Sequence, residues 1–226
     1  DEKVLKALEA CVPLAPLHNP ANITGIKAMM QALPGVANVA VFDTAFHQTM
    51  PAESYIYALP YELYEKYGVR RYGFHGTSHR YVSEKAAESL GIKQDQFNCI
   101  TCHMGNGSSF TAIKNGKSYD TTMGMTPVEG LVMGTRAGDV DGGIFSFLEA
   151  NAGMSVKDID NMLNKKSGLL GISGISSDMR DIEKAASEGN SRAQLAVDAL
   201  IHRSVKYIGA FAALLGKVDA IIFTGG

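Results

Sequence analysis

The stretch from His103 to Ser109 combines small and polar side chains in a way that suits phosphate binding. It reads His-Met-Gly-Asn-Gly-Ser-Ser between two segments of strand-like composition, so we expect a tight turn. Glycines let backbone N–H groups approach an anion, and the leading histidine and the two hydroxyls add polar groups suited to a phosphate. Asn-Gly is also the strongest short signal for a plain β-hairpin, which stays an alternative.

A second cluster, Arg71 to His79, comes just before a predicted helix. His75 and His79 lie four residues apart beside glycine and hydroxyl residues, and the N-terminus of a helix attracts anions. The pattern therefore favours a phosphate contact, with His75 the stronger candidate. A metal pair is one alternative, although no third ligand is obvious. A capping segment that contains a core histidine is the other.

Arg136 lies in a glycine-rich loop, Gly130 to Asp141. An arginine in such a loop has little around it to bury it, and its planar guanidinium group can capture an anion. The alternative is an ion pair with Asp139 or Asp141, and the sequence does not decide between the two.

Asp43 follows residues 36–42, which read as a buried strand. Carboxylates at the C-terminal ends of strands in open α/β sheets often face the ligand crevice, where they hold Mg²⁺ or its waters. Asp43 could equally cap the next turn. Farther along the chain, Asp178 to Arg180 reads first as a helix start with an aspartate N-cap.

Cys99 to His103 matches the C-x-x-C-H pattern of covalent haem attachment. In a strand, a spacing of three puts the two sulfurs on opposite faces, and no second Cys/His pair follows to complete a zinc site. We expect both cysteines to be buried packing residues.

The elements that must position these residues follow from hydrophobic periodicity. Strand-like runs joined by glycine-containing turns predict a β-meander, and later helices and a terminal strand predict an α/β fold with a mixed sheet flanked by helices. Ser78 is the expected N-cap of one helix and Gly91 its end. We expect strands at 36–42, 97–102, 108–114, 117–122 and, buried, from 218 onward. We expect helices at the start of the chain and at 19–32, 78–90, 143–150, 156–164, 179–188 and 191–215.

Composition narrows the class of protein. The 226 residues suffice for one large domain or two small ones, and 46% hydrophobic with 19% charged residues is ordinary for a globular α/β protein. A formal net charge of -2 argues against nucleic acid as the main partner. No apolar run is long enough to cross a membrane, and the start lacks the layout of a signal peptide. Three cysteines fit a reducing cytoplasm.

Taken together, the motifs resemble the acetate kinase family (acetokinases) of the acetate and sugar kinase, chaperone ATPase and actin superfamily. They occur in family order over nearly the whole chain, and the ordered set is highly specific although each motif alone is weak. The matching stretches are His18–Pro20, Phe42–His47, Tyr72–His79, His103–Ser109, Gly130–Asp141, Asp178–Arg180 and Thr224–Gly226.

The resemblance implies two RNase H-like (actin-like ATPase) domains around a nucleotide cleft. Residues 1–46 would end the first domain, and residues 47–226 would form most of the second, through which the family forms homodimers. It implies reversible in-line transfer of the γ-phosphoryl group between ATP and acetate, giving acetyl phosphate and ADP, with Mg²⁺ or Mn²⁺.

Residue roles are carried over position by position. The resemblance implies that Asp43 is an acid/base or metal-organising carboxylate, and that His75 and Arg136 stabilise the transition state. It places His18 near acetate. It assigns ATP contacts to His103, Met104, Gly105, Asn106, Gly107, Asp178, Met179 and Arg180, and to Gly226, which opens the adenosine loop. Acetate is already ionised at neutral pH, so it needs no base. We therefore prefer a role in which Asp43 orients a metal ion through water, or orients water itself, to a basic role.

The family's N-terminal phosphate hairpin, substrate arginine and C-terminal glutamate for Mg²⁺ have no counterpart in these residues. We therefore expect an internal part of a longer cytoplasmic enzyme, with no metal ligand set of its own and inactive in isolation. Two alternatives stay open: a kinase for propionate or butyrate, and a non-catalytic ATP-binding module. The second needs His75 and Arg136 less, if both reach the γ-phosphate.

Overall fold

The computed structural model describes residues 2–12 and 19–225 and divides the chain into two compact units, Asp1–Phe42 and Asp43–Gly226. In the first unit, helix α1 (Glu2–Ala10) packs on helix α2 (Asn19–Ala32) through the buried Leu5 and Ile23. The two predicted helices of this unit are confirmed. The predicted boundary after Phe46 stays a prediction, although Phe46 itself packs within the second unit.

The predicted strand at 36–42 is wrong. These residues are extended but pair with no described strand, and Val39 is 84% exposed. Alternating β-branched residues favour a strand only where a neighbouring strand satisfies the backbone N–H and C=O groups, and among the described residues none does so.

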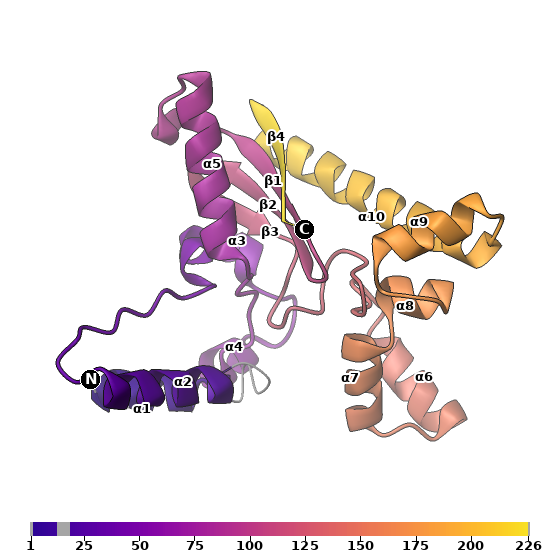
Figure 1. Cartoon of the computed structure of the whole chain (residues 1–226), viewed down its shortest axis with the longest axis horizontal. Coiled ribbons are helices and arrows are strands. Elements are labelled where there is room, and N and C mark those ends of the chain that lie inside the picture. The colour runs from indigo at the N-terminus through magenta and orange to yellow at the C-terminus, as the bar shows by residue number, and fades with distance from the viewer. Residues whose placement is uncertain (1, 13–18, 226) are drawn as a thin grey trace. The chain divides into compact units, whose positions relative to one another are not determined.

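The second unit is built on a mixed four-stranded sheet in the order β3-β2-β1-β4 (Figure 1). Its strands are β1 (Cys99–Met104), β2 (Ser108–Lys114), β3 (Lys117–Thr121) and β4 (Ala220–Thr224). The first three form the predicted antiparallel meander, and β4 pairs in parallel with β1. β4 was predicted to be buried, which is wrong, because it lies at the sheet edge with Phe223 66% exposed.

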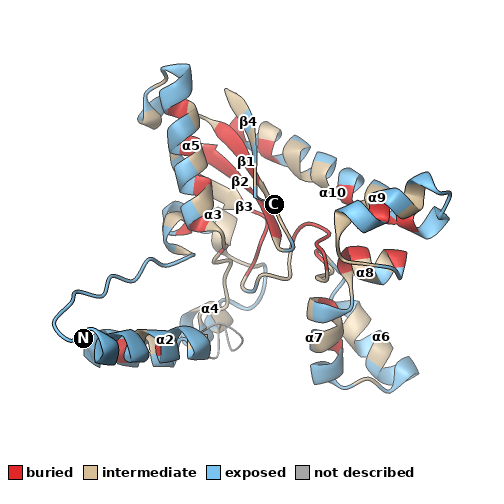
Figure 2. Ribbon diagram, in the orientation of Figure 1, coloured by how far each residue is buried: buried red, intermediate tan, exposed pale blue. Residues whose placement is uncertain are grey.

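Helices cover both faces of the sheet, with α5 (Gly76–Leu90) on one face and α10 (Ser191–Leu215) on the other (Figure 1). Successive side chains of β1 point to opposite faces of the sheet, toward α5 or toward α10. Cys99 packs in the cluster on the α5 face, whereas Ile100 and Cys102 pack against α10 residues such as Phe211. The two cysteines are thus buried, unpaired and on opposite faces, as predicted. Figure 2 shows the central strands as the most deeply buried part of this unit.

The first half of α10 extends past the sheet and packs on smaller helices. Ile182, Ala196 and Leu200 are buried in this second apolar cluster, which also includes Val132 of the glycine-rich loop. The remaining α-helices are α3 (Ala52–Tyr55), α4 (Tyr61–Tyr67), α6 (Gly143–Ala152), α7 (Val156–Lys165), α8 (Gly168–Ser173) and α9 (Met179–Ser187). Short 3₁₀ turns lie at η2 (Ala45–Thr49) and η3 (Gln94–Gln96).

Helix α5 begins two residues before the predicted Ser78 cap. Its N-cap residue is His75 in the left-handed conformation (φ 56°, ψ 24°), and the helix ends at the left-handed Gly91 as predicted. The Ser78 hydroxyl lies instead 2.9 Å from Nδ1 of His103 on β1. The cap prediction is therefore wrong because the hydroxyl has a long-range partner that local sequence does not reveal.

The glycine-rich loop is fixed to α10 by Asp139. Its carboxylate accepts from the backbone N–H of Gly130 at 2.9 Å and from the Tyr207 hydroxyl at 2.8 Å. It also pairs with Arg203 at 3.0 Å. One side chain thus closes the base of the loop and ties it to the longest helix.

Replacing Asp139 with Asn is expected to destabilise the protein, because the amide group turns a donor toward Arg203 or Tyr207. We expect a loss of about 1.5–3 kcal/mol of unfolding free energy, the value of hydrogen bonds to charged groups. Urea denaturation measures it. Asp141→Asn is the control, because among the described residues this carboxylate accepts only from the backbone N–H of Gly143, at an exposed helix start. Equal stability of the two variants would contradict the role of Asp139.

Candidate active site

Hydrogen bonds to the backbone of His75 and of its two neighbours hold this residue in its left-handed conformation. The Asp43 carboxylate accepts from the His75 backbone N–H at 3.0 Å, and the Asp43 carbonyl accepts from that of Gly76 at 2.8 Å. Nε2 of the buried His47 lies 2.8 Å from the Phe74 carbonyl, so this ring nitrogen carries a proton and donates it. A left-handed histidine is strained and persists only where its surroundings impose it, as they do here.

Gly76 is required by this arrangement. A Cβ atom at this position would lie 2.5 Å from the Asp43 carbonyl oxygen, so any side chain would displace the carboxylate-bearing turn. The predicted alternative that Asp43 caps the next turn is wrong, because that turn begins at Thr44 with no side-chain cap. The carboxylate and carbonyl of Asp43 instead fix the entry to α5.

Four histidines gather on the α5 side of the sheet, next to the first turns of α5. The rings of His75 and His103 stack, with centroids 4.1 Å apart and planes 25° apart. His79 lies edge-on to His103 at 6.2 Å and to His47 at 5.7 Å. No group of three or more His, Cys, Asp or Glu side chains in the described part of the chain is arranged to hold a metal ion. The metal-pair reading of His75 and His79 therefore finds no support in these residues.

Burial keeps these imidazoles neutral. It lowers the pKa of His75 to about 4, with His103 and Arg136 acting in the same direction and the Asp43 carboxylate opposing them. Burial also lowers the pKa of His47, His79 and His103. At neutral pH, His75 can thus offer a hydrogen bond without carrying a charge.

The predicted turn from His103 to Ser109 joins β1 and β2 next to this cluster. The Gly105 N–H donates to the Gly107 carbonyl at 3.2 Å, and the Ser108 hydroxyl donates back to the Gly105 carbonyl at 3.0 Å. Ser109 is buried and lies 2.8 Å from ring nitrogens of both His75 and His79. The two hydroxyls predicted to line a phosphate site therefore support the turn and the histidines instead.

Arg136 reaches the same turn from the glycine-rich loop. The neighbours of Arg136 in the loop are fixed by the end of α7 and the start of α8: the Ala137 N–H donates to the Leu163 carbonyl, and the Ser167 N–H to the Thr135 carbonyl, each at 3.0 Å. The guanidinium group is half-buried, which lowers its pKa, and forms no ion pair with any described residue. Asp139 and Asp141 bind other groups, so the predicted alternative of an ion pair with either is wrong.

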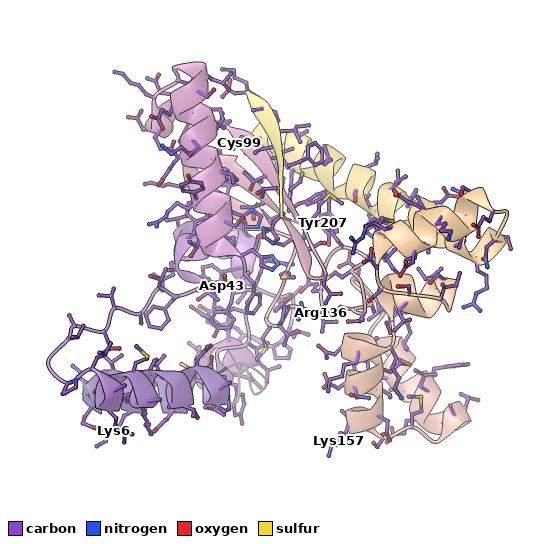
Figure 3. All side chains as sticks on the ribbon, viewed as in Figure 1. Lys6, Asp43, Cys99, Arg136, Lys157 and Tyr207 are labelled. Atoms are coloured by element: carbon purple, nitrogen blue, oxygen red, sulfur yellow. The ribbon has the colours of Figure 1, made fainter. Side chains whose placement is uncertain are left out.

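His75 and Arg136 converge on Gly107. A Cβ atom on Gly107 would lie 2.9 Å from Arg136 Nη1 and 3.6 Å from His75 Nε2. A cationic donor and a neutral ring nitrogen thus border one position that has no side chain. Figure 3 shows Asp43 beside the first turn of α5 and Arg136 among the loops at the end of the strands.

The segment Asp178 to Arg180 is linked to the turn through Gly134. Asp178 is the N-cap of α9, with its carboxylate accepting from the Arg180 N–H at 2.9 Å, as the sequence predicts. The preceding Ser177 carbonyl lies 3.3 Å from a Cβ built on Gly134, whose N–H donates to the Asn106 carbonyl at 3.1 Å. Met179 and Met104 pack on the same apolar cluster. The Arg180 side chain is 89% exposed and pairs with Asp178.

Two predicted residues, His18 and Gly226, lie outside the described residues. Gly225, next to the latter, is left-handed and packs against the backbone of Met104, so the end of β4 lies beside the turn. Sequence reasoning missed Thr101 and His47, which support the cluster. The period of two along β1 carries a signal for Thr101, because it places that residue on the face of His103.

Comparison with known proteins identifies the family. The model of the acetokinase family matches residues 1–226. The chain therefore belongs to the acetokinase family.

The similarity to individual relatives also extends over the whole chain. It is 62% identical to the acetate kinase of Treponema denticola over 226 residues, covering 100% of this chain and 57% of that protein. A crystal structure of Porphyromonas gingivalis acetate kinase matches with a TM-score of 0.96 and 57% identity, covering 100% of this chain and 57% of the other. A propionate kinase from Francisella tularensis matches with a TM-score of 0.96 and 51% identity, covering 100% and 58%.

The chain thus spans little more than half the length of these relatives. The predicted fold, a mixed sheet flanked by helices as in actin-like ATPases, is confirmed by the sheet and by its match to acetate kinase structures. Among residues 2–12 and 19–225, no helix has the length and apolar character needed to cross a membrane.

The buried histidines predict that stability falls with acidity. Their folded pKa values lie below the ordinary value of about 6.5, so the unfolded chain binds more protons at low pH. The stabilisation is complete above pH 6.5 and is lost as the pH falls toward 4, the pKa of His75. Each histidine that stays neutral contributes a slope of up to about 1.4 kcal/mol per pH unit.

Urea denaturation at pH 7.5 and 5.5 checks this expectation. His202, exposed on α10, supplies the control, because His202→Gln should leave the difference unchanged. Equal unfolding free energies at the two pH values would show that burial does not keep the histidines neutral.

Proposed function

We propose that the intact protein transfers the γ-phosphoryl group of ATP to acetate, reversibly and in line, giving acetyl phosphate and ADP. The observation that carries this proposal is the convergence of Arg136 and neutral His75 on the side-chain-free Gly107. Family membership and the identity with proteins named acetate kinase support it.

The chemistry needs charge neutralisation more than proton transfer. An acetate oxygen attacks the γ-phosphorus while the bond to the β–γ bridging oxygen breaks, and ADP leaves with that electron pair. Acetate is ionised at neutral pH, so no base is required. Arg136 offers a cationic, bidentate donor with no competing ion pair among the described residues, and His75 offers an uncharged one.

Asp43 is assigned an orienting role toward Mg²⁺ (or Mn²⁺) through water. The described residues lack a complete set of metal ligands, and Mg²⁺ commonly binds to substrate phosphates, waters and only one or two carboxylates. When bound, the ion neutralises phosphate charge. Asp43 also has a role that does not depend on the ion. Its Oδ2 accepts a hydrogen bond from the His75 backbone N–H, which fixes the direction of the imidazole.

The remaining roles surround this centre. The turn from His103 to Gly107 is proposed to contact the ATP phosphates, and its neighbour Asp178 to Arg180 the nucleotide. His18 is proposed to lie near acetate, and Gly226 to open the adenosine loop. We further propose a homodimer in the cytoplasm.

Propionate is the second candidate substrate, because the Francisella tularensis propionate kinase also matches at 51% identity. One methylene changes the transition-state free energy by only about 1–3 kcal/mol in an apolar pocket. Acetate is favoured by the higher identity, 62%, to a protein named acetate kinase. Comparing kcat/KM for acetate, propionate and butyrate in the hydroxamate assay for acyl phosphates decides between them.

Alanine at His75 or Arg136 is expected to lower kcat of the intact protein by about 10²–10³-fold, the effect of losing one transition-state donor. Nucleotide affinity should change little, because both donors act mainly on the transferred group. The hydroxamate assay measures kcat, and isothermal titration with ADP measures affinity. His202→Ala and Arg80→Ala, on exposed helix faces, are the controls. Weaker ADP binding by the variants of a protein that forms no acetyl phosphate would favour a non-catalytic ATP-binding module.

Asp43→Asn tests the orienting role separately. The amide retains an oxygen for the His75 N–H but removes the charge that acts on Mg²⁺ waters. We expect a fall in kcat and a higher Mg²⁺ concentration for half-maximal rate. Activity and Mg²⁺ dependence equal to those of the unchanged protein would disprove the role.

A further inference from the structure

An unbranched chain of hydrogen bonds runs from the middle of β1 to His75. The Thr101 hydroxyl lies 2.7 Å from His79 Nδ1, and His79 Nε2 lies 2.8 Å from the Ser109 hydroxyl. The same hydroxyl lies 2.8 Å from His75 Nδ1. Thr101, His79 and Ser109 are all 0% exposed, so water does not compete for these groups.

The Ser109 hydroxyl has no described partner besides the two rings, so it must donate to one ring and accept from the other. The chain can then carry its protons in two orders, and the buried end decides between them. Each neutral imidazole has one N–H and one bare nitrogen, and each hydroxyl has one proton to donate. If His79 Nδ1 donated to Thr101, the Thr101 hydroxyl proton would need another acceptor, and none of the described side chains or carbonyls accepts it. An unpaired buried donor is costly, because it gives up hydrogen bonds to water and gains none in the protein. The Thr101 hydroxyl therefore donates to His79.

The order then continues outward. With Nδ1 of His79 accepting, its Nε2 carries the proton and donates to Ser109, because burial keeps this ring neutral. Ser109, having accepted that bond, has its own proton free for His75 Nδ1. We propose that Ser109, oriented through His79 by Thr101, is a positioning residue that fixes His75 as the neutral Nε2–H tautomer.

The consequence lies at the mouth of the site. The edge of the His75 ring that borders Gly107 beside Arg136 carries Nε2 and Cε1, each 3.6 Å from a Cβ placed on Gly107. In the fixed tautomer both neighbours are donors with no acceptor between them, which suits a phosphoryl oxygen. The opposite tautomer would present a lone pair there and repel it. That the Nε2 proton binds a phosphoryl oxygen rests on the proposed function, whereas the location of the proton on Nε2 does not.

The location can be measured directly. In the full chain labelled with ¹⁵N-histidine, long-range ¹H–¹⁵N correlation spectra distinguish the tautomers, and His75→Gln and His79→Gln variants assign the signals. We expect both His75 and His79 to be Nε2–H at pH 7.5. A proton on Nδ1 of either ring would overturn the proposal.

Ser109→Ala tests the cause, with Ser108→Ala as the matched control. Ser108 is the adjacent serine, and its hydroxyl donates to Gly105 rather than to a histidine. A donor to bare Nδ1 stabilises only neutral His75, so its removal should raise the measured pKa of His75 and allow both tautomers. If Ser109 instead accepted from Nδ1–H, its removal would lower that pKa. The charged and titratable groups that face His75 are Asp43, Arg136, His47, His79 and His103, and neither substitution alters them.

The pKa comes from an NMR titration of both variants. A raised pKa in Ser109→Ala alone supports the proposal, whereas a lowered or unchanged pKa in Ser109→Ala, or the same change in both variants, overturns it. Ser109→Thr, which keeps the hydroxyl, should restore the original spectrum.

Kinetics of the intact protein separates this proposal from the proposed function. Ser109→Ala should lower kcat about tenfold, less than the 10²–10³-fold loss from removing a whole donor, with nucleotide KM within about twofold. If the protein makes no acyl phosphate but the spectra are as expected, the proposed function is wrong and the positioning role of Ser109 is supported. If the protein is active and Ser109→Ala matches the unchanged protein in kcat and spectra, the positioning role of Ser109 is wrong and the proposed function stands.

Discussion

The hydrogen bond between Asp43 and the backbone of His75 is the constraint on which the rest of the site depends. It joins residues 32 positions apart and holds a histidine in a conformation that glycine adopts far more readily. Because His75 is the N-cap of α5, the same bond sets where the helix begins and which way its first side chains face. The backbone therefore sets the direction of the His75 imidazole, and the contacts of the two ring nitrogens determine which of them carries the proton.

The sheet supplies the second half of the positioning. One strand, β1, packs Ile100 and Cys102 against α10, and its second half turns Thr101 and His103 toward α5. A single element therefore anchors both the apolar core and the hydrogen bonds of the histidines. The loop that carries Arg136 is fixed independently, by α7, α8 and the Asp139 contacts with α10. Arg136 and His75 lie 61 residues apart in sequence (136 − 75). They meet at Gly107 because the loop that carries Arg136 and the helix start that carries His75, each fixed by its own contacts, both reach this residue.

Sequence alone predicted what local pattern controls. The bounds of α10 were predicted to the residue, since its amphipathic run is bracketed by Asn190, whose side chain caps the helix, and by Gly216. The strand at 36–42 was wrong because a strand requires a partner that composition cannot supply. The Ser78 cap was wrong because its hydroxyl has a partner on β1. For Arg136, the residue type predicted an anion site, but only the three-dimensional contacts of Asp139 and Asp141 excluded an internal ion pair.

The alternation along β1 has a consequence for how this segment can vary. Substitutions at even positions such as Ile100 and Cys102 change core volume and are open to compensation by neighbouring apolar residues. Substitutions at Thr101 and His103 change hydrogen bonds that no neighbour can replace. A deletion of one residue would exchange the two sets, turning hydroxyl and imidazole groups into the apolar layer and methyl groups toward His75. The length of this strand should therefore be under stronger selection than the identity of its apolar residues.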